Sequence, residues 1–258
     1  MDISSIVDRA TRRISHQPVL LELDLSRGLL EAGPTDPLAA VRSRGVPTLR
    51  GLVDQLRRAT DDDRVVGLVA QVSASSLPPS HADELAEAVE AFAATGRTTV
   101  AWTESFGEGG TGTTGYRLAV AFDTIWMQPS GELGLTGVAG RGLFVRGLLD
   151  RLGVEPQFGQ RHEYKNAADL FMRESMSDAQ REALQQLADS VLDGVVSTAA
   201  RRRTRTVQQV RDAVDAAPLS GPDAVAAGLV DRLGYRDEVY DDLRERLGDD
   251  GRLTLRYV

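Results

Sequence analysis

The sequence contains no cysteine. This absence excludes disulfide bonds, thiolate metal sites and a cysteine nucleophile, although it says little about the compartment. Histidine is also scarce, and His16, His81 and His162 do not have the spacing of a metal site. We therefore expect no metal centre in this chain.

Long apolar runs and excess positive charge are missing as well. No run of 18 apolar residues occurs, so the sequence predicts no transmembrane span. Residues 1–16 carry charges and lack the apolar core of a signal peptide. The net charge of −8 and the pI near 5.0 argue against nucleic acid as the main partner. With 41% hydrophobic residues, we expect a single domain over residues 1–258 that begins with an arm over residues 1–17.

Lysine is nearly absent, because Lys165 is the only lysine among the 30 Lys and Arg residues. Arginine keeps its proton in proteins, whereas a desolvated lysine loses its proton and then acts as a base. The small and apolar neighbours Ala167, Ala168, Leu170 and Phe171 suit a partly buried amine. On these residues alone, a catalytic lysine and an ordinary surface lysine in an arginine-rich chain remain open in equal measure.

Predicted strands and helices alternate along the chain. Strands are predicted over residues 18–25, 64–72, 98–102, 124–128 and 155–162, with an edge strand over 253–258. Helices are predicted over residues 48–59, 80–96, 116–122 and 143–152, and the longest runs from 177 to about 203. This alternation predicts an α/β fold with a mostly parallel central sheet.

Two further patterns favour structure over chemistry. Gly107, Gly109 and Gly112 match G-x-G-x-x-G, but they follow several βα units and precede a short helix, so a dinucleotide site is disfavoured. The arginines of residues 201–205 end the longest predicted helix, where they complement its dipole. We expect a solvated helix end there, not a patch for lipid or for an acidic partner.

Three stretches together resemble one known family. They are residues 164–168 with Met176 and the long helix, residues 122–129 followed by 134–137, and residues 219–231. Their order and spacing are similar to those of the signal peptide peptidase A (protease IV) family, serine peptidase family S49. The resemblance extends from about residue 18 to residue 234. It implies a ClpP/crotonase-like fold and a serine nucleophile with a lysine general base, which would be Lys165.

The position of the nucleophile departs from that family. Short members place a serine ten residues before the aspartate that corresponds to Asp123, and this sequence has Thr113 there. The turn that helps to hold the oxyanion carries two glycines in the family, whereas residues 73–79 here have no glycine and two prolines. The resemblance therefore implies the N-terminal, lysine-bearing half of a long-form member. The serine would then come from a second domain or a neighbouring chain.

The resemblance also implies how a substrate would bind. A peptide would lie as an added strand along Gly134, Leu135, Thr136 and Gly137. Expected substrates are apolar peptides such as cleaved signal peptides, the expected partner is a second copy or a serine-bearing domain, and no cofactor is needed. The family is usually associated with membranes, but this chain shows no anchor, so its localisation is left open. Two alternatives remain: a catalytically inactive domain with a scaffold or assembly role, and a crotonase-type acyl-CoA enzyme on the same fold.

Overall fold

The structure is a computed structural model that describes residues 17–258, except 27, 34–35, 37, 39–40, 42, 44, 73–76, 109–110, 160 and 249–252. The chain divides into two compact units. The sheet unit comprises the residues up to Thr136 and those from Thr198 onwards, and the helical unit comprises Gly137–Ser197. The expected arm over residues 1–17 lies outside the described residues except for Gln17. That residues 1–258 form one domain stays a prediction.

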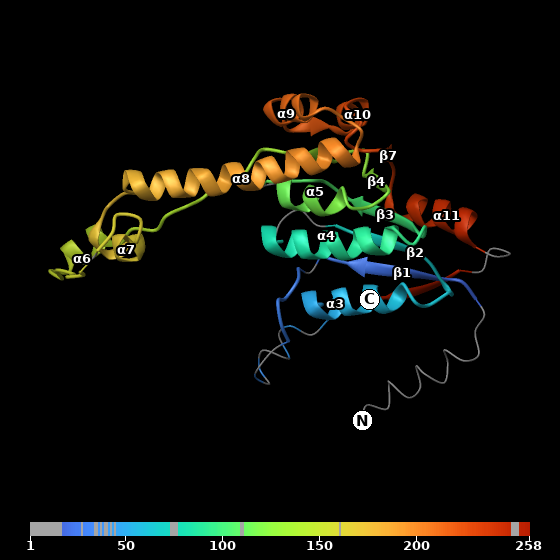
Figure 1. Ribbon diagram of the computed structural model, residues 1–258, viewed down its shortest axis with the longest axis horizontal. Helices are drawn as coiled ribbons and strands as arrows, with labels where there is room; N and C mark the ends of the chain where they lie inside the picture. Colours follow the sequence, from blue (N-terminus) through green and yellow to red (C-terminus); the bar gives the residue numbers. More distant parts are fainter. Residues whose placement is uncertain are drawn as a thin grey trace. The chain divides into compact units, whose positions relative to one another are not determined.

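The sheet unit is built on six parallel strands in the order β7-β4-β3-β2-β1-β8 (Figure 1). The strands are β1 (Val19–Asp24), β2 (Val65–Gln71), β3 (Thr98–Thr103), β4 (Thr124–Met127), β7 (Arg232–Leu233) and β8 (Thr254–Tyr257). The predicted α/β class with a parallel central sheet is confirmed. The predicted edge strand is confirmed too, because β8 pairs only with β1.

Helices cover the faces of this sheet, which explains why the residues of β1, β2 and β3 are largely buried. The helices α3 (Leu49–Ala59), α4 (Pro79–Ala93) and α5 (Thr113–Ala119) lie side by side (Figure 1). The helix α11 (Arg236–Leu247) contributes Val239 and Leu243 to a core cluster with Leu20 and Trp102 of the strands. Residues that alternate along β2 are therefore buried on both sides.

The starts of the helices show which sequence signals hold. Thr48 accepts a hydrogen bond from the Gly51 N–H and caps α3, as expected. The helix expected from residue 80 begins one residue earlier, with Pro79 at its first position and no side-chain cap. Asp83 in its first turns pairs with Arg117 of α5 at 2.9 Å. The helix expected from residue 116 begins at Thr113.

The arginine run at residues 201–205 has a different role from the one expected. The guanidinium of Arg202 donates to the carbonyls of Val120 and Ala121 at 2.9 and 2.8 Å. Arg203 pairs with Asp231, and Arg205 donates to the Ala227 carbonyl at 2.9 Å. The prediction of a solvated helix end is therefore wrong for Arg202 and Arg203, which are partly buried and bonded within the chain, whereas Arg205 is exposed.

The rest of the sheet unit consists of short elements. A small antiparallel sheet pairs β5 (Glu132–Leu133) with β6 (Leu219–Ser220). The helix α9 (Val207–Asp215) begins at a capping box of Thr206 and Gln209, and α10 (Gly221–Ala226) begins at Ser220. These elements surround the stretch 219–231 that resembles the family's closing segment.

The helical unit contains α6 (Arg146–Arg151), the 3₁₀ turn η1 (Asn166–Ala168), α7 (Asp169–Met172) and most of α8 (Asp178–Arg202). Ser177 caps α8 by accepting from the Gln180 N–H at 3.2 Å, which agrees with the expected start of the longest helix near residue 177. The strand predicted over residues 155–162 is wrong, because the described residues there form no ladder. Phe158 instead stacks on Phe171 with ring centroids 5.5 Å apart.

Candidate functional site

Thr113 occupies the first position of α5, directly after the glycine-rich turn that follows β3. Its side chain is fully buried, and its hydroxyl lies 2.8 Å from that of Thr111. A nucleophile must reach a substrate carbonyl, so this hydroxyl would need the turn to open before it could attack. The structure therefore gives Thr113 a structural hydrogen bond at the position where a nucleophile was expected.

Two glycines bring the backbone of residues 130–137 against this turn. The Gly112 N–H donates to the Gly134 carbonyl at 2.8 Å, and the Gly134 N–H donates to the Phe106 carbonyl at 2.6 Å. A Cβ atom at Gly112 would lie 2.4 Å from the Phe106 carbonyl oxygen, and one at Gly134 would lie 2.7 Å from it. Only glycine fits at these two positions, so the two glycine-rich stretches form one backbone assembly beside Thr113.

The four predicted substrate-binding residues differ in accessibility. Gly134 and Leu135 are buried, and both backbone groups of Gly134 are already bonded within the chain. Thr136 is exposed, and Gly137 has a φ of +88° that suits glycine alone. Of these four, Thr136 is the exposed residue, as an added peptide strand would need.

Two other loops flank the expected site, one held by Ser105 and the other the proline-containing turn. The Ser105 hydroxyl donates to the Glu132 carbonyl at 3.1 Å and accepts from the Glu132 N–H at 3.2 Å. This serine therefore joins two loops. Of the proline-containing turn at residues 73–79, residues 73–76 lie outside the described part. Leu77 is buried, and Pro78 precedes α4.

Lys165 lies in the helical unit, in the turn that precedes η1. Its N–H donates to the His162 carbonyl at 3.0 Å, and its side chain is exposed in the single chain. The expectation of a partly buried amine is not met here, because Ala167 and Phe171 are exposed too.

Contacts within the helical unit hold the turn that carries Lys165. The neighbouring Tyr164 donates its hydroxyl to the Glu182 carboxylate of α8 at 2.8 Å, and this hydrogen bond raises the pKa of Tyr164. The Val145 N–H donates to the Leu170 carbonyl at 2.8 Å. Asp169 is buried and pairs with Arg173 at 3.4 Å. Spacing in the sequence did not indicate the Tyr164–Glu182 contact, because 18 residues separate the two side chains.

Hydrogen bonds thus link some of the candidate site residues, whereas others belong to different units. Thr113 and Gly134 lie in the sheet unit and are linked through Gly112. Lys165 belongs to the helical unit. The Thr111–Thr113 hydrogen bond was missed at the sequence level, although two threonines flanking Gly112 are a usable signal for it.

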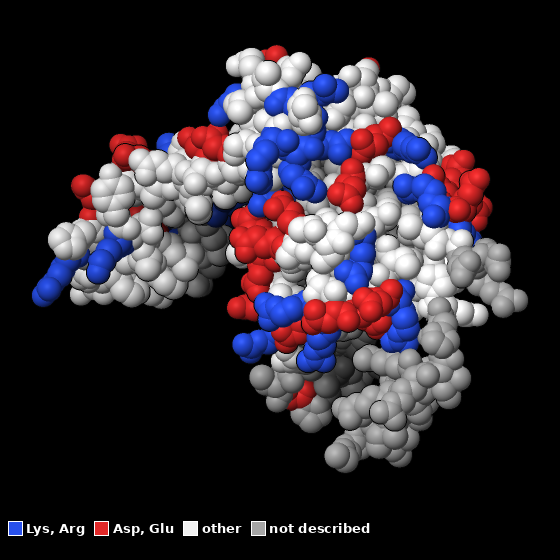
Figure 2. Space-filling view, turned by 45° about the vertical axis from the view of Figure 1, so that its right-hand side comes forward, with Lys and Arg blue, Asp and Glu red and all other residues white. Residues whose placement is uncertain are grey.

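Surface charge and the positions of acidic and histidine side chains bear on which ligands the chain could hold. On the face shown in Figure 2, cationic and anionic side chains are interspersed, without a broad basic field. Among the described residues, no three His, Asp or Glu side chains gather as metal ligands. Within the same residues, no helix has the length and apolarity to cross a membrane.

The sequence is similar to known proteins of one peptidase family. The model of peptidase family S49 matches residues 91–249. The chain is 26% identical over 205 residues to a chloroplastic serine protease SPPA from Arabidopsis thaliana, covering 78% of this chain and 29% of that protein. It is 27% identical over 210 residues to Protease 4 from Salmonella typhi, covering 78% of this chain and 33% of that protein. The chain thus spans about a third of the length of these relatives.

Solved structures show more distant likenesses. A ClpP1 mutant from Listeria monocytogenes has a TM-score of 0.48 at 9% identity, covering 90% of this chain and 98% of that one. An enoyl-CoA hydratase/isomerase from Marinobacter aquaeolei has a TM-score of 0.43 at 10% identity, covering 77% of this chain and 64% of that one. The six-stranded parallel sheet flanked by helices agrees with the ClpP/crotonase-like class expected from the sequence.

Proposed function

Because the chain belongs to peptidase family S49, we propose that it is the lysine-bearing domain of a serine endopeptidase that uses a Ser–Lys mechanism. Lys165 is the general base, and the serine comes from a second domain or a neighbouring chain. The domain corresponds to the N-terminal half of a long-form member, and its substrates are apolar peptides such as cleaved signal peptides. The observation that carries the proposal is the pairing of a single exposed lysine with a buried threonine at the nucleophile position.

In the proposed mechanism, the Lys165 amine takes part in two proton transfers. The neutral Lys165 amine takes the proton of the serine hydroxyl as its oxygen attacks the carbonyl carbon of the peptide. The resulting ammonium then returns the proton to the nitrogen of the leaving peptide, and the acyl-enzyme is hydrolysed by water. Backbone N–H donors must stabilise the oxyanion at both stages. Thr136 is the exposed residue through which substrate backbone would pair.

In the proposal, desolvation of the amine comes from a partner that covers the helical unit. A neutral lysine near neutral pH needs a low-dielectric surrounding, and the Lys165 side chain is exposed here. A second chain that covers the helical unit would supply both this desolvation and the serine. The proposal therefore requires an assembly.

Exposed apolar side chains support such an assembly. Among the described residues, nine of the fifteen large apolar side chains that are exposed belong to the helical unit. They are Leu143, Leu148, Leu152, Val154, Phe158, Tyr164, Phe171, Met172 and Leu187. A concentration of this kind is typical of a protein–protein contact surface.

The test is hydrolysis of a fluorogenic apolar peptide by the purified chain, alone and with a separately expressed serine-bearing S49 domain. We expect activity only in the mixture, and we expect Lys165→Ala to abolish it. Activity of the chain alone that is lost in both Lys165→Ala and Thr113→Val would overturn the external nucleophile. Activity of the mixture that survives in Lys165→Ala would overturn the assignment of the base.

A second candidate function is favoured by the burial of Thr113. A domain whose nucleophile position is occupied by a buried threonine suits a catalytically inactive scaffold that positions an active partner. In that case the mixture would cleave the peptide equally well with the wild-type chain and with Lys165→Ala. The same comparison therefore separates the two candidates.

A further inference from the structure

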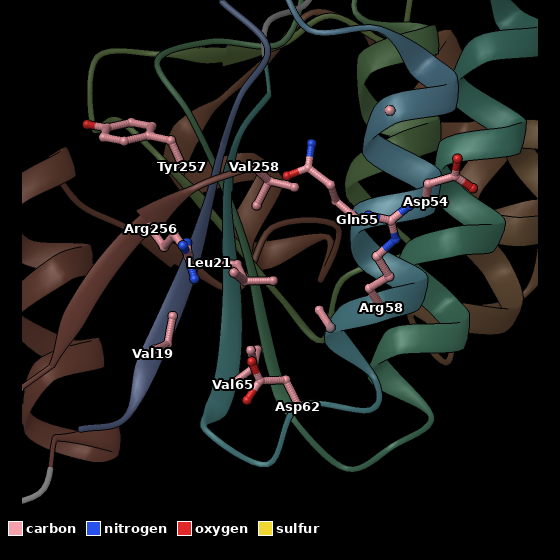
Figure 3. A pocket seen from close by; sticks show the side chains of 12 residues that line it. Val19, Leu21, Asp54, Gln55, Arg58, Asp62, Val65, Arg256, Tyr257 and Val258 are labelled. Carbon is pink, nitrogen blue, oxygen red and sulfur yellow. The ribbon is translucent and has the colours of Figure 1, made fainter. Parts of the chain in front are cut away.

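The described residues that line the pocket between α3 and the edge formed by β1 and β8 include none of the candidate site residues. The volume of this pocket is about 420 Å³. Figure 3 shows Val19 and Leu21 of β1 on one side of it, and Gln55 and Arg58 of α3 on the other. These residues belong to the sheet unit, whereas Lys165 belongs to the helical unit and is held by contacts within that unit.

Lys165 ends a hydrogen-bonded turn at the surface of the helical unit. Its N–H donates to the His162 carbonyl at 3.0 Å, which closes the turn over Glu163 and Tyr164. Residues 161–165 are exposed, so burial in a core does not hold the turn in place. A segment with few buried contacts opens easily unless other bonds tie it to a stable element.

Tyr164 supplies such a bond immediately before Lys165. Its hydroxyl donates to Oε2 of Glu182 at 2.8 Å, and Oε1 of the same carboxylate accepts from the Gln186 side-chain amide at 3.4 Å. Because Glu182 and Gln186 both belong to α8, the long helix orients the acceptor. A hydrogen bond to an ionised carboxylate is also stronger than one between neutral groups. The turn is therefore tied to α8 through a charged acceptor.

The chain after Lys165 is held further along, in α7. The Val145 N–H donates to the Leu170 carbonyl of α7 at 2.8 Å, and Asp169 at the start of that helix is buried. Tyr164, by contrast, is the direct neighbour of Lys165 in the chain. A change in the bond between Tyr164 and α8 would therefore displace Lys165 more directly than a change in α7.

We propose that Tyr164 and Glu182 are a positioning pair that holds the Lys165 amine where it meets the serine hydroxyl. This inference rests on the proposed function, in which Lys165 is the general base. Proton transfer requires the base within hydrogen-bond reach of the hydroxyl, and a misplacement of about 1 Å costs about 100-fold in rate. In this role the pair contacts neither the substrate nor the reacting atoms, and it acts through the backbone of the turn.

The protonation state of the phenol suits this role. The hydrogen bond to Glu182 raises the pKa of Tyr164 above its ordinary value near 10. A desolvated lysine amine loses its proton at a lower pH than an exposed one. The phenol therefore remains a donor to Glu182 at the pH at which the covered Lys165 amine acts as a base.

The single lysine allows the position of the turn to be measured without any activity. Labelling with ¹⁵N-lysine gives one backbone amide signal, that of Lys165. We expect its order parameter to be about 0.85, as in rigid backbone, and to fall below about 0.6 in Tyr164→Phe. Glu182→Gln keeps an acceptor oxygen and should preserve the order, whereas Glu182→Ala should lower it. The matched control is Gln185→Ala, which removes an exposed hydrogen bond to Asp189 on the same helix and should change nothing.

Peptide hydrolysis by the mixture with a serine-bearing S49 domain gives the second readout. We expect Tyr164→Phe and Glu182→Ala to lower kcat by about tenfold or more while KM stays within about twofold, because the alignment of the base is lost and substrate binding is not. Glu182→Gln should restore most of kcat, and Gln185→Ala should match the wild-type chain.

The outcomes separate this inference from the function on which it rests. An active mixture in which Tyr164→Phe is as fast as the wild-type chain would overturn the positioning role and leave the proposed function standing. Equal order of the Lys165 amide in the wild-type chain and in Tyr164→Phe would overturn it as well. A wild-type mixture without activity, or one that Lys165→Ala does not affect, would overturn the proposed function and the positioning role with it.

Discussion

Lys165 is the residue on which the proposed chemistry depends, and arginine cannot replace it. In the assembled enzyme we expect Lys165→Arg to lower kcat/KM by a factor of about 10³ although charge and length are nearly kept, because a guanidinium does not give up its proton. Peptide hydrolysis by the mixture of domains measures the effect.

The matched control for this substitution is Arg161→Ala, which removes a charge from the same exposed segment. It should leave kcat/KM within about twofold, since exposed charges contribute little. A similar loss in both variants would mean that positive charge around the turn is what matters, and proton transfer by Lys165 would be rejected.

The Thr113 hydroxyl is expected to contribute to stability. Thr113→Val keeps the shape but removes the hydrogen bond to Thr111 in a fully buried place. We expect a loss of about 1–2 kcal/mol in the free energy of unfolding by urea. Thr114→Val, at the partly buried next position, should change it by less than about 0.5 kcal/mol. Equal losses of unfolding free energy in the two variants would show that the Thr111–Thr113 hydrogen bond does not add to stability.

At the scale of elements, alanine substitution should have opposite effects on stability at a glycine between the two loops beside α5 and at a glycine within α8. Gly134→Ala would bring a Cβ to 2.7 Å from the Phe106 carbonyl oxygen, so we expect a loss of about 1–3 kcal/mol. Gly194 lies on an exposed face in the middle of α8, and a Cβ atom there would meet nothing within 4 Å. Gly194→Ala should therefore raise the free energy of unfolding by about 0.5–1 kcal/mol. Urea unfolding of both variants checks the opposite signs. A gain in Gly134→Ala would contradict the close approach.

The central sheet could be predicted because its strands carry their own signal. The run from Val65 to Gln71 is apolar at nearly every position, which only a strand buried on both faces explains. The segment 155–162 carries no such run, because Phe158 is its only large apolar side chain, and its described residues form no strand. Its Phe158 packs against Phe171 of α7, and a contact made after folding leaves no periodicity in the sequence.

The candidate site was predictable only in part, for a similar reason. Lys165 stood out by composition alone, and the position of Thr113 followed from the resemblance. Its burial did not, because it depends on backbone hydrogen bonds that Gly112 and Phe106 make with Gly134 of a separate loop. The roles of Arg202 and Arg203 were missed likewise, since a basic helix end looks the same in the sequence whether it faces water or carbonyl groups.

For the whole molecule, the exposed apolar side chains of the helical unit predict self-association or binding to a partner domain. Leu148→Glu with Leu152→Glu should weaken that association by about tenfold or more, because each side chain is more than half exposed in the single chain. Val207→Glu in the sheet unit is the control and should have little effect. Light scattering over a range of concentrations measures the mass, and equal weakening by both would place the contact elsewhere.

Alkaline pH should destabilise the chain through a buried phenol. Burial raises the pKa of Tyr116 above its ordinary value near 10, and its hydroxyl donates to the Leu229 carbonyl at 2.8 Å. The unfolded chain therefore loses this proton first. The stabilising effect is complete below pH 10 and falls by up to about 1.4 kcal/mol per pH unit above it. In Tyr116→Phe, the free energy of unfolding in urea should decrease less steeply between pH 9 and 11. An unchanged slope would show that other groups cause the decrease.

The pairing of β8 with β1 has a consequence for synthesis on the ribosome. Val19 pairs with Thr254, so the strand that covers this edge is made more than 200 residues after the strand it protects. At about 5–20 residues per second, β1 would wait on the order of 10–50 s with one row of backbone groups unpaired. During that interval the nascent chain exposes a template for pairing with other nascent chains. We therefore expect demand for chaperones to be concentrated in translation, before β8 emerges.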